Sequence, residues 1–168
     1  MAQLPNLNMQ GYCAMRTSLL TTAAILISFT LGWAARDYKS ELLTLHERDL
    51  QAHLKTDVNM LSPAADPFVT VSDGKIEKVN PAQERAFFTD YFRNAKYPQY
   101  EDAEPPIIGV SKDGTLGYVI SRIRAHRLEK DVQGKPREGR FVYAGIMVYE
   151  KRGGEYVRVA NVSTFERQ

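Results

Sequence analysis

The chain has 168 residues, with 22 Lys and Arg against 20 Asp and Glu, which gives a net charge of +2 at pH 7. This near-neutral balance argues against a nucleic-acid partner, since domains that bind nucleic acid usually carry a strong basic excess. Hydrophobic residues make up 43% of the chain and charged residues 25%, which is typical of a globular protein rather than a disordered one. The length fits one domain and a targeting segment.

An uncharged, mostly apolar segment spans residues 17–35, directly after Arg16. A basic residue, an apolar stretch and small residues at its end are typical of a secretory signal, with Ala34 as a candidate cleavage position. We interpret residues 1–35 as a helical signal peptide and 36–168 as an exported domain, periplasmic or secreted. The alternative is an uncleaved membrane anchor formed by residues 17–35, because about 20 apolar residues span a bilayer. That segment is the only expected contact with a membrane.

The single cysteine, Cys13, precedes the apolar segment. One cysteine excludes an intramolecular disulfide, a C-x-x-C redox pair and a cysteine zinc cage. The chain also lacks a phosphate-binding glycine loop and an H-E-x-x-H zinc motif, so we expect no cofactor and no metal. Met15 offers a second candidate translation start, close to Arg16.

The first helix of the exported domain is expected from Tyr38 to about Asn59. Asp37 suits its N-cap, and Pro63 helps to end it. Leucines at spacings of 7, 4 and 7 predict one shared apolar face. These are Leu43, Leu50, Leu54 and Leu61.

A turn at residues 72–74 is predicted between two short β-prone runs, 67–71 and 75–79. A second helix then begins at Asn80-Pro81 and runs to about residue 95, with Gln83 placed for a capping box. Its expected apolar face consists of Ala86, Phe87, Tyr91 and Phe92. Residues 96–106 are polar and proline-rich, which favours a loop.

The period changes to 2 after residue 106, which predicts strands. Short glycine turns separate several of them, and strands joined this way are antiparallel neighbours. Two helices followed by a curved antiparallel meander give an α+β domain. The expected strands cover residues 107–110, 116–129, 141–150 and 156–165.

Taken in order, these elements resemble a SnoaL-like domain of the nuclear-transport-factor-2-like superfamily, over about residues 37–165. The long helix with His46 and His53, the turn at 71–76, Asn80-Pro81 and the runs 108–117 and 156–165 carry the resemblance. It implies a cone in which a curved antiparallel sheet wraps the long first helix around a pocket. Many members dimerise through the outer sheet face, and the superfamily includes isomerases, cyclases, dehydratases, hydrolases and binding or assembly domains, so the fold does not choose the function.

Three titratable residues of the first helix, His46, His53 and Asp57, are predicted to lie on one strip beside Leu43 and Leu50. A histidine beside a carboxylate could act as a general base, so these three are the catalytic candidates. They spread over ~16 Å of helix axis, too far to ligate one metal ion together. The alternative is that the strip only borders the core.

Alternation along the later strands predicts which side chains face inward. In 116–127 the face with Val119, Ile123 and Ala125 is expected to be buried, and Arg122 and Arg124 to face outward. In the last strand Val157, Val159, Asn161, Ser163 and Phe165 would share one face. Asn161 is then a polar candidate for the pocket wall, since a buried amide needs a partner.

Both faces of residues 141–149 are apolar, which suits a sheet with helices on one side and a second subunit on the other. We therefore expect a homodimer, with a monomer as the alternative.

The function that we predict is binding of a small, largely apolar molecule, with His46, Leu50, His53, Asp57 and Asn161 as ligand-binding residues. The first alternative is an acid–base enzyme of isomerase, cyclase or lyase type. The second is a structural or assembly module whose cone is filled by its own side chains.

Overall fold

The computed structural model describes residues 37–131 and 133–167. The predicted signal or anchor segment, together with Cys13 and Met15, lies outside these residues. No helix among the described residues is long and apolar enough to cross a membrane.

Helix α1 spans Tyr38–Lys55 and is shorter than predicted. Asp37 caps its start, and its side chain accepts a hydrogen bond from the Ser40 amide. The helix stops before Pro63 because Thr56 adopts a left-handed conformation, with φ of 50°, and its N–H bonds back to the carbonyls of the last turn. A short 3₁₀ helix, η1, follows at Val58–Met60.

The buried face of α1 differs from the predicted leucine stripe. Leu42, His46 and Ala52 are buried, whereas Leu43 and Leu54 are 36% and 37% exposed. The prediction failed because it assumed that the face turned toward the sheet would be the most hydrophobic one. The helix instead turns histidine and carboxylate side chains inward.

Strands β1 (Ala64–Ser72) and β2 (Lys75–Val79) form the predicted hairpin. Asp73 and Gly74 both have positive φ, at 51° and 74°, which suits a two-residue turn. Helix α2 then spans Pro81–Asn94.

The predicted capping box of α2 is present between Asn80 and Gln83. The predicted apolar face is only partly right. Phe92 is buried, but Phe87 is 62% exposed and Glu84 is buried. This arrangement suits a helix that covers an open cavity rather than a filled core.

The sheet is mixed and open, in the order β2-β1-β7-β6-β5-β3, with β4 also paired to β5. Neighbours are antiparallel except β1 and β7, which are parallel. The expectation of a wholly antiparallel sheet was therefore wrong, since no short turn joins these two strands to fix their direction. The remaining strands are β3 (Ala95–Asp102), β4 (Ile107–Val110), β5 (Leu116–Lys130), β6 (Pro136–Arg152) and β7 (Glu155–Arg167).

Strand β3 replaces part of the predicted loop at residues 96–106. It holds Pro98, which has no N–H to donate, but a proline is tolerated on an edge strand. The pairing with β5 shifts register between Lys96 and Gln99, around this proline.

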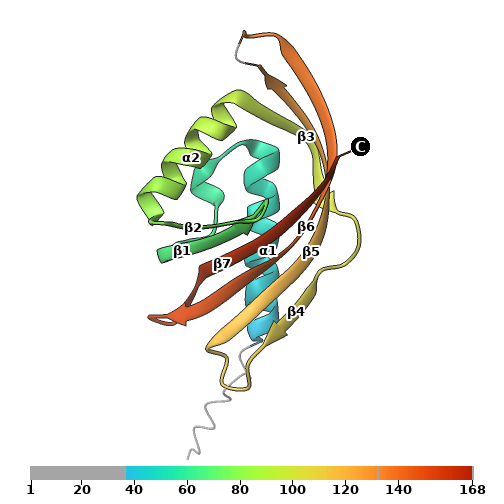
Figure 1. Ribbon diagram of the computed structural model, residues 1–168. Helices are drawn as coiled ribbons and strands as arrows, with labels where there is room; N and C mark the ends of the chain where they lie inside the picture. The colour runs from blue at the N-terminus through green and yellow to red at the C-terminus, as the bar shows by residue number, and fades with distance from the viewer. Residues whose placement is uncertain (1–36, 132, 168) are drawn as a thin grey trace, which may run out of the picture. The chain divides into compact units, whose positions relative to one another are not determined.

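Both helices lie on the concave side of the sheet (Figure 1). Leu42 of α1, Val119, Tyr149 and Tyr156 form the main buried cluster. Gly117 allows the close approach, since a Cβ there would lie 2.5 Å from Leu42 Cδ1. On β5 the predicted sides are confirmed: Val119, Ile123 and Ala125 are buried, while Arg122 and Arg124 are exposed.

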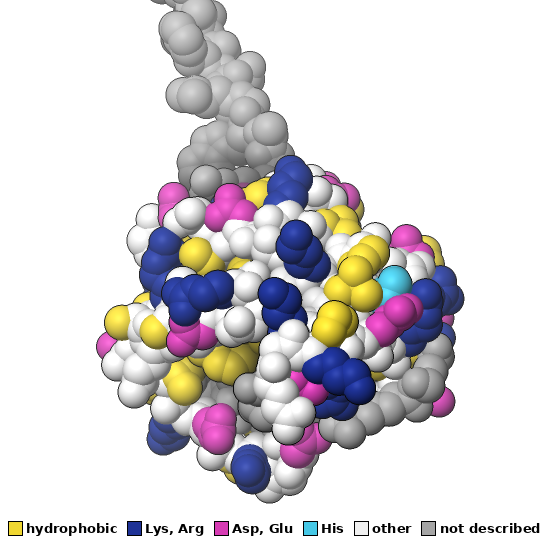
Figure 2. Space-filling view, turned by 90° about the horizontal axis from the view of Figure 1, so that it is seen from above, with side chains coloured by type: hydrophobic (Ala, Val, Ile, Leu, Met, Phe, Trp, Pro, Cys, Tyr) yellow, Lys and Arg dark blue, Asp and Glu magenta, His cyan; other side chains and the backbone are white. Residues whose placement is uncertain are grey.

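The surface at one end of the domain mixes side chains of every type. Seen from above, Lys and Arg stand beside acidic and hydrophobic side chains (Figure 2).

Candidate functional site

A cavity of about 1120 Å³ lies between the helices and the inner face of the sheet. Its wall is rich in aromatic rings and contains buried titratable groups. The aromatic lining includes Phe68, Phe87, Phe88, Tyr91, Tyr97, Tyr100, Phe141, Tyr143, Tyr149 and Phe165. A volume of this size matches pockets that hold small organic molecules.

One face of α1 forms the helical wall, with His46, Asp49, Leu50 and His53 lining the cavity. Their spacing of 3, 4 and 7 residues places them on adjacent turns of the same side. Three of the predicted ligand-binding residues are thus brought together. The strip also includes Asp49, which the sequence analysis missed although it lies three residues from His46 and four from His53.

His46 is buried, and its Nε2 lies 2.9 Å from both carboxylate oxygens of Asp102. Asp102 is the last residue of β3, the strand that was predicted as a loop. This partner could therefore not be identified from helical spacing. The pair ties α1 to the edge strand and fixes the orientation of the imidazole.

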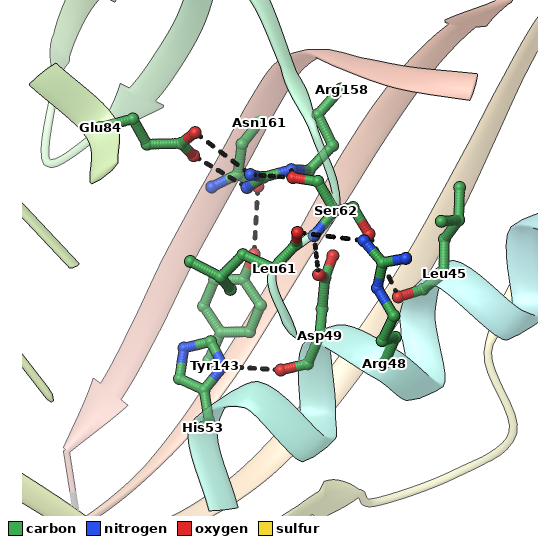
Figure 3. Close-up of polar contacts among 10 residues, drawn as sticks. All are labelled: Leu45, Arg48, Asp49, His53, Leu61, Ser62, Glu84, Tyr143, Arg158 and Asn161. Carbon is green, nitrogen blue, oxygen red and sulfur yellow. Dashed lines mark hydrogen bonds and ion pairs between the residues drawn. The ribbon is translucent and has the colours of Figure 1, made fainter. Parts of the chain in front are cut away.

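The carboxylate of Asp49 is held by Ser62. Its Oδ1 accepts a hydrogen bond of 2.6 Å from the Ser62 amide (Figure 3). Burial raises the pKa of Asp49, and the nearby Arg158 guanidinium opposes this shift. The carboxyl group can therefore exchange a proton at a higher pH than an ordinary aspartate does.

His53 is held by a backbone hydrogen bond and by an aromatic stack. Its Nδ1 lies 2.8 Å from the carbonyl oxygen of Asp49 and must carry the proton, since a carbonyl only accepts. The ring stacks on Tyr100 at 4.1 Å, nearly parallel. Burial lowers the pKa of His53 to about 4, so the imidazole is neutral near pH 7 and its Nε2 can accept a hydrogen bond.

Asp57 does not join this strip, and its predicted place beside His53 on α1 was wrong. The helix ends at Lys55, and Asp57 instead caps η1. Its Oδ1 accepts from the amide and side chain of Asn59, at 2.9 and 3.0 Å. Asp57 is not among the residues that line the cavity.

A register shift in β7 changes which side chains of this strand face the cavity. Tyr149 pairs with Arg158 and Val148 with Ala160, so Val159 is an extra residue in the ladder. The predicted run of Val157, Val159 and Asn161 on one face is therefore wrong. Arg158 and Asn161 both face the cavity, as predicted only for Asn161.

Arg158 is 3% exposed and connects β7 to α2 and to the loop before β1 (Figure 3). Its Nε donates to the Ser62 carbonyl at 2.9 Å. Its Nη2 donates to Glu84 Oε2 of α2 at 3.1 Å, and Nη1 forms an ion pair with Oε1 at 2.8 Å. Burial raises the pKa of Glu84 while Arg158 opposes the shift. This arginine is fully engaged by protein groups and holds α2 over the cavity.

Tyrosine hydroxyls supply the remaining polar atoms. Tyr143 donates to Asn161 Oδ1 at 3.1 Å, and Tyr91 contacts the hydroxyl of Tyr97. Burial raises the pKa of Tyr100 and Tyr149, so both hydroxyls stay protonated and can donate.

No group of three or more His, Cys, Asp or Glu side chains among the described residues could hold a metal ion.

No protein-family model and no curated protein matches this chain. Several solved structures are similar to it. A ketosteroid isomerase-like protein from Erwinia carotovora atroseptica has a TM-score of 0.57 at 12% identity, covering 76% of this chain and 95% of its own. A putative calcium/calmodulin-dependent kinase II association domain from Exiguobacterium sibiricum also has a TM-score of 0.57, at 12% identity, covering 76% and 92%. An NTF2-like protein of unknown function from Pseudomonas putida has a TM-score of 0.55 at 18% identity, covering 75% and 84%.

These similarities extend over most of each compared chain, at identities that show the fold alone. The curved open sheet, the enclosed helix and the cavity between them fit the same architecture. The described domain therefore has the nuclear-transport-factor-2-like fold that its sequence resembles.

Proposed function

We propose that the domain binds a small organic molecule with an apolar, ring-containing body and a polar oxygen. The observation that carries this proposal is the aromatic cavity with inward-facing hydroxyl and amide groups. A module filled by its own side chains would leave no such volume, so the cavity favours binding over a purely structural role.

The polar groups suit recognition of an oxygen on the ligand. Protonated tyrosines donate hydrogen bonds, and the Nε2 of His53 accepts them. Rings of the lining such as Phe88 offer a contact surface for a planar body.

Acid–base catalysis is the second candidate, and a specific pair of groups favours it. Asp49 and His53 lie one helical turn apart on the cavity wall, and burial shifts the pKa of each toward its neutral form. Perturbed titratable groups in a cavity are typical of catalytic sites. An ionised Asp49 could take a proton from carbon, while a tyrosine hydroxyl stabilises the oxyanion that forms. One similar structure is described as ketosteroid isomerase-like.

The proposal also covers the cellular setting. An exported homodimer fits the apolar segment at 17–35 and the outer face of the sheet. On that face Tyr118, Ile146 and Val162 are 41%, 37% and 41% exposed. Exposed apolar groups on one sheet face are typical of subunit contacts.

Binding is tested by native mass spectrometry of the purified protein, followed by titration with the compound that denaturation releases. Ser121 and Arg122 give a matched pair of variants, since they are neighbours on opposite faces of β5. Ser121→Phe fills the cavity and should weaken binding at least ten-fold, whereas Arg122→Phe should not. A protein that carries no compound and binds nothing in a small-molecule panel would contradict the proposal.

Catalysis is tested with the released compound as substrate. Asp49→Asn should abolish turnover while it leaves the affinity within a few-fold of the original protein. Equal turnover by the variant would remove Asp49 as the base.

A further inference from the structure

The cavity has a second set of polar groups near the β5–β6 hairpin, at the end away from the cluster around Leu42. Arg127 pairs with Gly139 across the two strands, and Glu129 pairs with Arg137. All four residues line the cavity. They belong to the inner face, at the end away from the Leu42 cluster.

Arg127 has donor capacity that the protein does not use. Its Nη2 donates to Glu129 Oε1 at 3.0 Å, and its Nη1 lies 3.5 Å from the Tyr91 hydroxyl. Its Nε is buried and has no hydrogen-bond partner among the described residues. The guanidinium lies 5.7 Å from the centre of the Phe141 ring. A buried donor without an acceptor is costly. The side chain as a whole is 29% exposed, so a small rotation that brings this donor to an acceptor from outside the protein would be favoured.

Gly139 leaves room for such an acceptor. It stands opposite Arg127, and a Cβ built there would meet no atom within 4 Å. The glycine therefore keeps space open beside the guanidinium, where most other residues would place a side chain.

The local charge is also unbalanced toward positive. Arg127 is paired with Glu129, and Arg140 lies 3.5 Å from Glu138. No ion pair of Arg137 occurs among the described residues, and this side chain is exposed. The inner end of the hairpin thus combines an arginine with a free donor, an arginine without an acidic partner and an open position between the strands.

We propose that this end of the cavity binds the acid group of an organic anion whose apolar body lies among the aromatic rings. The proposal rests on ligand binding in the cavity and names the ligand class: an apolar, ring-containing acid with one carboxylate or sulfonate. A carboxylate or sulfonate accepts two hydrogen bonds from arginine and carries the opposite charge, which a neutral ligand of similar shape does not.

Two fluorescent probes test the proposal on the full chain. 1-Anilinonaphthalene-8-sulfonate and N-phenyl-1-naphthylamine share one ring system, and only the first carries an acid group. The protein should bind the sulfonate at least ten-fold more tightly, at one site per chain by calorimetry. Added salt should lower the affinity for the sulfonate and leave the affinity for the neutral probe unchanged.

The variants localise the acid group. Arg127→Gln and Arg137→Gln should each lower the affinity for the sulfonate about ten-fold and leave the affinity for the neutral probe unaffected. Gly139→Asp should do the same, because it places a competing carboxylate in the open position. Arg124→Gln is the matched control: this arginine lies on the outer face of β5, 3.6 Å from Glu101, and its loss should change neither affinity.

Each outcome decides a different point. Equal affinities for the two probes, or equal losses in both for Arg127→Gln, would overturn the anion site while leaving the cavity as a binding site. Binding of neither probe, with Ser121→Phe indistinguishable from the original protein, would overturn the proposed function itself.

Discussion

The two halves of α1 meet the sheet in opposite ways. Near its start, Leu42 is fully buried against Val119, Tyr149 and Tyr156, and glycine at position 117 lets the Leu42 side chain approach the backbone of β5. Near its end, the same side of the helix presents Asp49 and His53 to the cavity. One half is packed, and the other is hollow and polar.

Two kinds of interaction therefore hold the same helix in place, apolar burial in one half and directed polar contacts in the other. The packed half depends on apolar burial, which is non-directional and scales with area. The hollow half adds directed contacts through Asp49, Ser62 and Arg158 to the aromatic stack on His53. Such contacts keep the cavity open and hold its polar groups in position.

The largest expected effect is at Arg158. Arg158→Met leaves the buried Glu84 without its cation and should lower the free energy of unfolding by about 3 to 5 kcal/mol, measured by urea denaturation. A double variant, Arg158→Met with Glu84→Leu, should recover much of this loss. A double variant as unstable as the single one would show that the hydrogen bonds to Ser62 carry the effect instead.

Leu42→Ala tests the packed half and should cost about 2 to 5 kcal/mol, because the lost side chain leaves a void. The same substitution at the exposed Leu43 is the control and should cost less than about 1 kcal/mol. Ligand affinity should be unchanged in both. Similar costs at positions 42 and 43 would contradict the assigned buried face of α1.

The pH dependence of stability probes the hollow half. The pKa of His53 is lowered from 6.5 to about 4, so between these values the unfolded chain binds a proton that the folded chain refuses. His53 should therefore make stability fall as the pH drops from about 6.5 to 4, by about 2 to 3 kcal/mol in total. His53→Gln should remove this part of the slope, and His126→Gln should retain it. An unchanged slope in His53→Gln would mean that His53 ionises freely in the folded state.

The smallest effect is expected at the start of α2. Asn80→Ala removes the side chain that caps this helix and should cost about 1 kcal/mol in thermal unfolding. Because α2 covers the cavity, the same variant should also release bound probe faster. Unchanged release would show that the start of this helix does not control access.

Much of the fold could be predicted from short-range sequence patterns. The cap at Asp37, the capping box at Asn80 and the turn at Asp73-Gly74 all depend on neighbours within a few residues, and each is confirmed. The inward and outward sides of β5 followed from simple alternation. The resemblance drawn from these elements is confirmed at the level of the fold.

Most of the errors have a cause that lies outside any local window. The β3 edge strand, the parallel β1–β7 pair and the bulge at Val159 depend on segments far apart in the chain, whereas α1 ends at the local left-handed cap at Thr56. Three of these features changed the candidate site. The early end of α1 removed Asp57, β3 supplied Asp102, and the bulge turned Arg158 inward.

The sequence by itself determined the two helices, the first hairpin and the four later strands, their caps and turns, and the placement of His46, Leu50 and His53 on the helical wall. These features follow from periodicity and short-range hydrogen bonding. Only the tertiary structure decided which polar groups meet across the cavity and which of them are buried. Burial and pairing depend on contacts between distant residues, and these set the pKa of Asp49 and His53.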